Sequence, residues 1–99
     1  MKALVTGAGG QLATELARLR QQVADMQASP AAPAAAATVC AHASAIAEAA
    51  GNMMADRKWY SISAAGLVEA AKAVGAAASP MVDTALKVLD LLNKVRAAA

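Results

Sequence analysis

Five large apolar residues near the start of the chain recur at the spacing of a helix that buries a narrow seam. They lie 4, 3, 4 and 3 positions apart and comprise Leu12, Leu16, Leu19, Val23 and Met26. This is the a and d pattern by which one helix packs against another helix. Alanine supplies about a third of the chain, and its small side chain lets helix backbones approach closely. We therefore predict an all-α protein, a small helical bundle of about four helices with a short coiled-coil-like helix near its N-terminus.

The length and the composition limit the core that this chain can build. Its 99 residues suffice for one small domain, near the lower limit for a single stable core. The hydrophobic fraction is 59%, but alanine supplies most of it, and aromatic residues make up only 2%. Because aromatic side chains contribute the most buried area, a lone monomer would be marginally stable, and a core shared with a partner is the natural remedy.

Prolines and changes in composition divide the chain into four parts. Pro30 and Pro33 interrupt helical structure, since each lacks an amide donor and disfavours helix in the residue before it. The predicted parts are a flexible or weakly ordered leader over 1–10, an amphipathic heptad helix over 11–28, a proline-containing linker over 29–33 and an alanine-rich helical bundle over 34–99.

Three further helices are expected in the alanine-rich part. The second helix is predicted over 34–54, and the charged cluster 56–58 forms an exposed corner after it. Trp59 begins the apolar face of a third helix, and Ser61 or Ser63 is its candidate N-cap.

A serine–proline pair marks the start of the fourth helix. Ser79 suits an N-cap and Pro80 suits the first helical position, and the helix is expected to end near Arg96. Leu86 and Leu89 are predicted to face the third helix in an antiparallel pair. The full apolar stripe comprises Val82, Ala85, Leu86, Leu89, Leu92 and Val95.

The seam of the first helix is also a candidate interface between chains. Glu15 falls at g and Arg20 at the following e, positions that face one another across a parallel pair. We therefore predict a homo-oligomer, with a parallel dimer favoured, or a helical protein partner. Because two heptads form a weak zipper, a bundle that uses the same seam within one chain is the alternative. The candidate interface residues are Leu12, Leu16, Leu19, Val23, Met26, Glu15 and Arg20.

Residue types that carry chemistry are few and scattered. Cys40 is the only cysteine and His42 the only histidine of the sequence. Because residues two apart on a helix do not face each other, they cannot form a catalytic pair within one helix. No second His or Cys completes a metal site, and the acidic residues form no close pair for general acid–base catalysis. The sequence therefore predicts no enzyme activity, no catalytic residue, no cofactor and no metal, with a small buried thiol and a partly exposed imidazole.

The charge balance does not favour nucleic acid or membrane partners. Nine basic and seven acidic residues give a net charge of +2. Arg57, Lys58, Trp59 and Tyr60 combine cations with rings, as in single-stranded nucleic acid binding. We favour the alternative in which Trp59 fills the junction of the second and third helices while the cations stay in solvent. Since no stretch is apolar enough to span a membrane, a cytoplasmic protein is predicted.

A glycine-rich turn follows a short apolar run at the start of the chain, which reads MKALVTGAGGQLA. Thr6, Gly7 and Gly10 match the turn TGxxGxxG, and Ala13 stands at its third glycine. Residues 1–16 resemble the N-terminus of short-chain dehydrogenases of the dTDP-4-dehydrorhamnose reductase type. This resemblance implies a strand that leads into a turn whose backbone amides approach a pyrophosphate.

The stretch 56–92 begins with an Asp-Arg-Lys-Trp corner that a helix pair is expected to follow. It resembles the C-terminal parts of small helical adaptor-like modules that accompany bacterial effector or defence genes, which implies an interaction role. The leading expectation is a non-enzymatic helical interaction or oligomerisation module, an adaptor in such a system. A membrane-associating helical protein and a fragment of a nucleotide-binding dehydrogenase-like protein are the alternatives.

Overall fold

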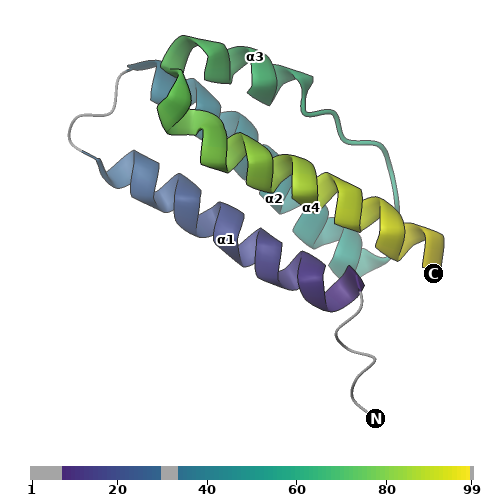
Figure 1. Ribbon diagram of the computed structural model, residues 1–99. Helices are drawn as coiled ribbons and strands as arrows, with labels where there is room; N and C mark the ends of the chain where they lie inside the picture. The colour runs from purple at the N-terminus through teal and green to yellow at the C-terminus, as the bar shows by residue number, and fades with distance from the viewer. Residues whose placement is uncertain (1–7, 30–33, 99) are drawn as a thin grey trace.

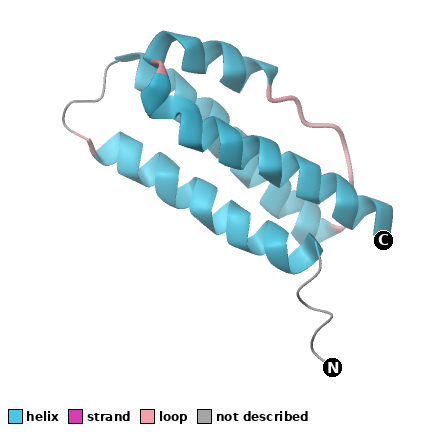
Figure 2. Ribbon diagram, viewed as in Figure 1, coloured by secondary structure: helices cyan, strands magenta, loops and turns pink. Residues whose placement is uncertain are grey.

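All regular structure is helical in the computed structural model, which describes residues 8–29 and 34–98. In chain order the elements are α1 (Ala8–Ala28), α2 (Ala34–Asp56), α3 (Ala65–Val74), the short 3-10 helix η2 (Ala76–Ala78) and α4 (Ser79–Ala98) (Figure 1). Figure 2 shows these helices joined by loops, with no strand in the described residues. The prediction of an all-α bundle of four helices is confirmed.

The three long helices lie side by side, and the short α3 covers one face of the bundle (Figure 1). α1 and α4 run in opposite directions and make the most extensive contact in the bundle. α2 runs antiparallel to α1 and packs against both α1 and α3. α3 contacts α2 much more than α4.

The seam predicted for α1 lies in the chain's own core. Leu12 and Leu19 are completely buried, and Leu16 and Val23 are nearly so. Met26 is partly buried and packs against the same core. The other helices contribute Val39, Ala43, Ile46, Ala50, Met53, Leu67, Met81, Val88, Leu91 and Leu92, among others. The seam therefore stabilises α1 against its neighbours within one chain.

The ends of α1 and α2 lie close to the predicted boundaries. α1 begins at Ala8, before the predicted start at Gln11, so the last residues of the predicted leader are helical. The rest of that leader, residues 1–7, and the linker residues 30–33 lie outside the described residues. α2 ends at Asp56, where the charged corner was expected.

The predicted start of the third helix at Trp59 is wrong. Residues 57–64 form a loop, and α3 begins at Ala65. Arg57 adopts a left-handed backbone conformation (φ +57°), which ends α2. Its amide still donates a hydrogen bond of 2.8 Å to the carbonyl of Met53, in the pattern of a helix C-terminus.

Side chains from this loop nevertheless pack against the core. Trp59 and Ile62 are partly buried, so their apolar spacing reflects burial from a loop and not from a helix. Ser63, one of the two candidate caps, accepts a hydrogen bond of 3.1 Å from the amide of Ala65 at the start of α3.

The break before α4 differs from the prediction. Ser79 has helical dihedral angles (φ −57°, ψ −45°), whereas an N-cap residue is extended. The chain instead turns at Gly75, whose φ of +89° suits glycine, and η2 then leads directly into α4. Pro80 accordingly lies in the first turn of α4, where its missing amide proton leaves no hydrogen bond unmade.

The buried face of α4 is rotated from the predicted stripe. Leu86 is 45% exposed, so its predicted burial against α3 is wrong, and Leu89 is only partly buried. The reason is that α4 packs chiefly against α1. Its buried residues are Met81, Thr84, Ala85, Val88, Leu91 and Leu92. The Thr84 hydroxyl donates a hydrogen bond of 2.9 Å to the carbonyl of Pro80, so this buried polar group has a partner.

Candidate functional site: a groove between α1 and α2

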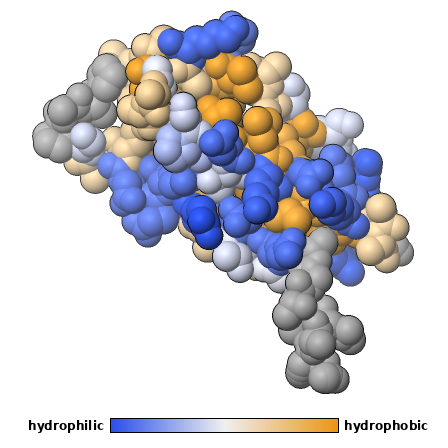
Figure 3. All heavy atoms as spheres, viewed as in Figure 1, coloured by the Kyte–Doolittle hydropathy of each residue, from blue (hydrophilic) through white to orange (hydrophobic). Residues whose placement is uncertain are grey.

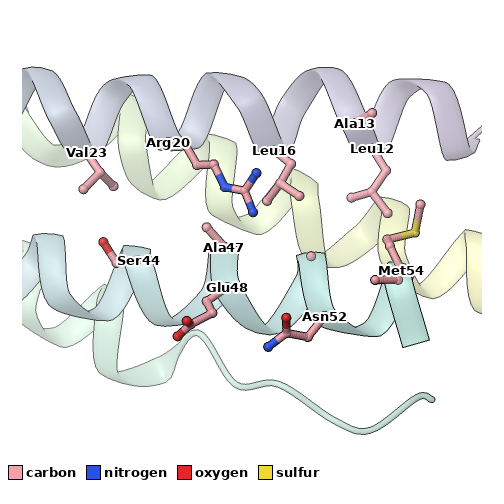
Figure 4. Close-up of a pocket in the computed structure, with 12 residues that line it drawn as sticks. Leu12, Ala13, Leu16, Arg20, Val23, Ser44, Ala47, Glu48, Asn52 and Met54 are labelled. Carbon is pink, nitrogen blue, oxygen red and sulfur yellow. The ribbon is translucent and has the colours of Figure 1, made fainter. Parts of the chain in front are cut away.

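A groove of about 930 Å³ runs between α1 and α2 (Figure 4). Its lining comes from these two helices alone, over 12–23 of α1 and 44–55 of α2. The lining residues are Leu12, Ala13, Leu16, Arg20, Val23, Ser44, Ala47, Glu48, Gly51, Asn52, Met54 and Ala55. We call this feature the α1–α2 groove.

The groove exists because long apolar side chains on α1 meet short ones on α2. α1 contributes Leu12, Leu16 and Val23, which form an apolar floor although none is more than 7% exposed. α2 opposes them with Ala47 and Gly51, which do not extend far enough to fill the space between the helices. Protein interiors are normally packed without such voids, so the unfilled space at this surface is a candidate binding site.

Opposite charges stand on the two walls of the groove. Arg20 reaches from α1 toward α2, and Glu48 lies on α2 at the same level along the groove (Figure 4). The Arg20 guanidinium crosses over Gly51, since its Nη2 lies 2.9 Å from the place that a Cβ would occupy there. Ser44 and Asn52 add a hydroxyl and an amide to the same rim.

The charges of the groove are not used in the ion pairs of the bundle. In the part of the chain that the structure describes, the ion pairs are Arg18–Glu15, Lys72–Glu69 and Lys94–Asp90. Arg20 and Glu48 take part in none of them, and both residues are exposed. They are therefore accessible to groups from outside the chain.

The structure separates the predicted interface residues into two sets. Four of the seven line the α1–α2 groove, namely Leu12, Leu16, Arg20 and Val23. Leu19 is fully buried, and Met26 lies outside the groove lining. The Glu15 carboxylate lies 3.5 Å from Arg18 Nε, so within this chain it pairs with Arg18 and not with Arg20. The dimer itself stays a prediction.

Sequence reasoning did not identify the α2 wall of the groove. Ser44, Glu48 and Asn52 are four residues apart, which places them on one side of a helix. Small residues at Ala47 and Gly51 lie between them. This pattern of polar residues with small neighbours was visible in the sequence. It indicates a groove wall only when α1 is known to pack opposite it.

Cys40 and His42 face different neighbours. Cys40 is 2% exposed, and its thiol lies 3.9 Å from the carbonyl oxygen of Val23 in α1. Burial raises the pKa of this thiol, which disfavours the thiolate. His42 is exposed and its ring lies against Gly66 of α3. The predicted buried thiol is confirmed, and the two groups do not meet.

The charged corner after α2 is solvated. Arg57 and Lys58 are exposed, Tyr60 is 54% exposed, and Trp59 is partly buried against the core. The expectation that the cations stay in solvent is confirmed. Trp59 packs against the core but is only partly buried, so it fills the predicted junction incompletely.

A second apolar surface lies between α3 and α4. Figure 3 shows hydrophobic atoms gathered between these helices on the face seen in Figure 1. Val68 is 36% and Leu86 is 45% exposed. A hollow of about 290 Å³ lies there and is lined in part by Val68 and Val82. This hollow is much smaller than the α1–α2 groove.

The described residues form neither a metal site nor a membrane-spanning helix. Over 8–29 and 34–98, no three His, Cys, Asp or Glu side chains come together in a way that holds a metal ion. No helix in the same residues combines the length and hydropathy needed to cross a membrane. Of the glycine-rich motif, Gly10 and Ala13 lie in α1, while Thr6 and Gly7 fall outside the described residues.

Comparisons with protein-family models, with curated proteins and with solved structures found no match to this chain.

Proposed function

We propose that this protein is a non-enzymatic helical protein–protein interaction module that accepts an α-helix in the α1–α2 groove. The observation that carries the proposal is a large groove with an apolar floor and polar rim between two long helices. A helix docks in such a groove through apolar side chains at positions i, i+3, i+4 and i+7. The oligomerisation role and the role of a cytoplasmic adaptor beside bacterial effector or defence proteins belong to this proposal.

The dimensions of the groove suit a short helix. It extends along α1 from Leu12 to Val23, a distance of about 16 Å at the helical rise of about 1.5 Å per residue. Three turns of a partner helix cover that length. The single cation Arg20 and the single anion Glu48 favour a partner that carries both charges flanking an apolar stripe.

The composition of α4 does not favour membrane docking. Its exposed side carries Asp83, Lys87 and Asp90, so acidic and basic groups alternate there. A helix that lies on a membrane surface usually has a strongly basic polar face.

A labelled peptide tests the helix-docking proposal directly. The probe is a fluorescein-labelled, 18-residue amphipathic helix of leucine, alanine, lysine and glutamate, and its anisotropy is followed as the intact protein is added. We expect saturable binding with a Kd on the order of 100 µM, typical of a small unoptimised contact.

Two matched variants of α2 locate the binding. Ser44→Trp places a ring in the groove and should weaken peptide binding at least tenfold. Ala45→Trp places the same ring on an exposed neighbouring position that does not line the groove, and should leave binding unchanged. No saturable binding, or equal binding to both variants, would contradict the proposal.

A further inference from the structure

The charges of the α1–α2 groove are arranged so that the groove is complementary to itself. Arg20 and Glu48 lie on opposite walls at the same level along the helices (Figure 4). Neither side chain has an ion-pair partner among the described residues. A surface that pairs with a copy of itself across a two-fold axis needs this arrangement, because each residue must meet a different residue of the copy.

The direction of the two-fold axis follows from the same positions. An axis parallel to the helices places α1 of one copy over α2 of the other and keeps each residue at its own level. Arg20 of each copy then meets Glu48 of the other, which gives two identical ion pairs. An axis perpendicular to the helices within the α1–α2 plane would instead place α1 over α1, and the charges would not be paired in this way.

Small side chains on the rim permit the close approach that such a dimer requires. The exposed rim positions include Ala13, Ser44 and Ala55, none of which is long enough to hold a second helix away. A chain of 99 residues with 2% aromatic content also has a small core of its own. Covering the exposed Ala13 and Ala55 and the partly exposed Met54 therefore adds buried area where the chain has little.

We propose that the α1–α2 groove is covered by the same face of a second copy of this chain, in a parallel two-fold dimer with reciprocal Arg20–Glu48 pairs. The proposal rests on the proposed function of the α1–α2 groove as a surface that binds helices, and it names those helices as α1 and α2 of the copy. The two α1 helices run parallel, as the first-helix heptads predict, but each faces α2 of the other copy and not α1. The proposal replaces Glu15 with Glu48 as the partner of Arg20, because Glu15 is paired with Arg18 within the chain.

Sedimentation velocity of charge variants tests the reciprocal pairs. The intact protein should pass from a 9.8 kDa monomer to a dimer of twice that mass between about 1 µM and 1 mM. Arg20→Glu and Glu48→Arg each replace two attractions with two repulsions, so each variant alone should dimerise at least tenfold more weakly. An equimolar mixture of the two variants should dimerise as the intact protein does, because each contact then joins opposite charges again.

The mixing step isolates contacts between chains. A pair formed within one chain is not restored when two different variants are mixed. The reversals change the net charge from +2 to 0 in Arg20→Glu and to +4 in Glu48→Arg, so overall attraction does not explain a rescue. Lys87→Glu is the control, because it makes the same change of net charge on α4, outside the groove lining, and should leave the dimer intact.

Several results would overturn the inference and spare the proposed function. The first is a monomer up to about 1 mM that still binds the amphipathic peptide. The second is a dimer that neither charge reversal weakens. The third is a dimer that is lost in Leu86→Glu on the α3–α4 surface and kept in Arg20→Glu. Circular dichroism of each variant establishes that it is folded, since all these positions are exposed.

Discussion

A comparison of alanine variants at two leucines in mid-helix positions shows which face of the bundle contributes most to its stability. Leu19 of α1 is completely buried, whereas Leu86 of α4 is 45% exposed, although the sequence assigned both to apolar stripes. Truncation to alanine removes the same atoms at both positions. The small gain in helix propensity is also the same, so it cancels in the comparison. The difference between Leu19→Ala and Leu86→Ala therefore reports on burial alone.

The magnitude follows from the exposure of each side chain. At about 0.8 kcal/mol for each buried carbon group, truncation of a fully buried leucine loses about 2.4 kcal/mol. The cavity left behind by Leu19→Ala raises the loss to about 3–5 kcal/mol. About half of Leu86 is already in water and no enclosed cavity remains, so Leu86→Ala should lose about 1 kcal/mol or less.

Thermal unfolding followed by circular dichroism distinguishes these values. For a domain of about this size, 1 kcal/mol shifts the Tm by about 4–8 °C. Leu19→Ala should therefore melt at least about 8 °C below Leu86→Ala. Equal losses in the two variants would refute the assignment of the core. The Tm should be measured at several protein concentrations, because a seam buried between chains would make it depend on concentration.

Three further measurements test individual contacts. Gly51→Ala should raise the free energy of unfolding by up to about 1 kcal/mol, because alanine favours a helix interior and only the flexible end of Arg20 must move. A loss of stability in urea unfolding would contradict this. Burial raises the pKa of the Cys40 thiol in the folded protein above its ordinary value of 9.0. The stability that the buried, protonated thiol contributes is therefore complete below pH 9.0 and is lost as the pH rises toward the folded-state pKa. Urea unfolding between pH 8 and pH 10 should show this loss, and Cys40→Ala should remove it. The fluorescence of Trp59, which is partly buried, should be partly quenched by iodide, and emission typical of full exposure to water would contradict its packing against the core.

The parts of the fold that the sequence predicted are those in which a single helix carries the signal. α1 has apolar residues on one narrow side only, so the seam that includes Leu12 and Leu19 identified its buried face without knowledge of its neighbours. The prolines and the charged cluster 56–58 likewise marked boundaries through local backbone chemistry. Local causes of this kind act before any tertiary contact forms.

The face of α4 depended on tertiary packing. Apolar residues surround much of this helix, since Leu86 and Val88 point in well-separated directions. Either side could be buried, and the extensive contact with α1 selected the side that contains Val88. The spacing from Trp59 to Ile62 misled the prediction of α3 in a related way. Apolar residues that pack against a core from a loop can have helical spacing without being helical.

The alanine-rich composition also explains why a groove lies on one side of α1 and a filled core on the other. α4 meets α1 with larger side chains such as Val88 and Leu91, which fill the space between the two helices. α2 meets α1 with Ala47 and Gly51 along the groove, so a groove remains beside the α1 side chains although these are themselves nearly buried. A stable monomer would be expected to place a larger residue there, since filling such a space commonly stabilises a protein. In the proposed docking function, a helix from outside the chain completes this unfilled wall.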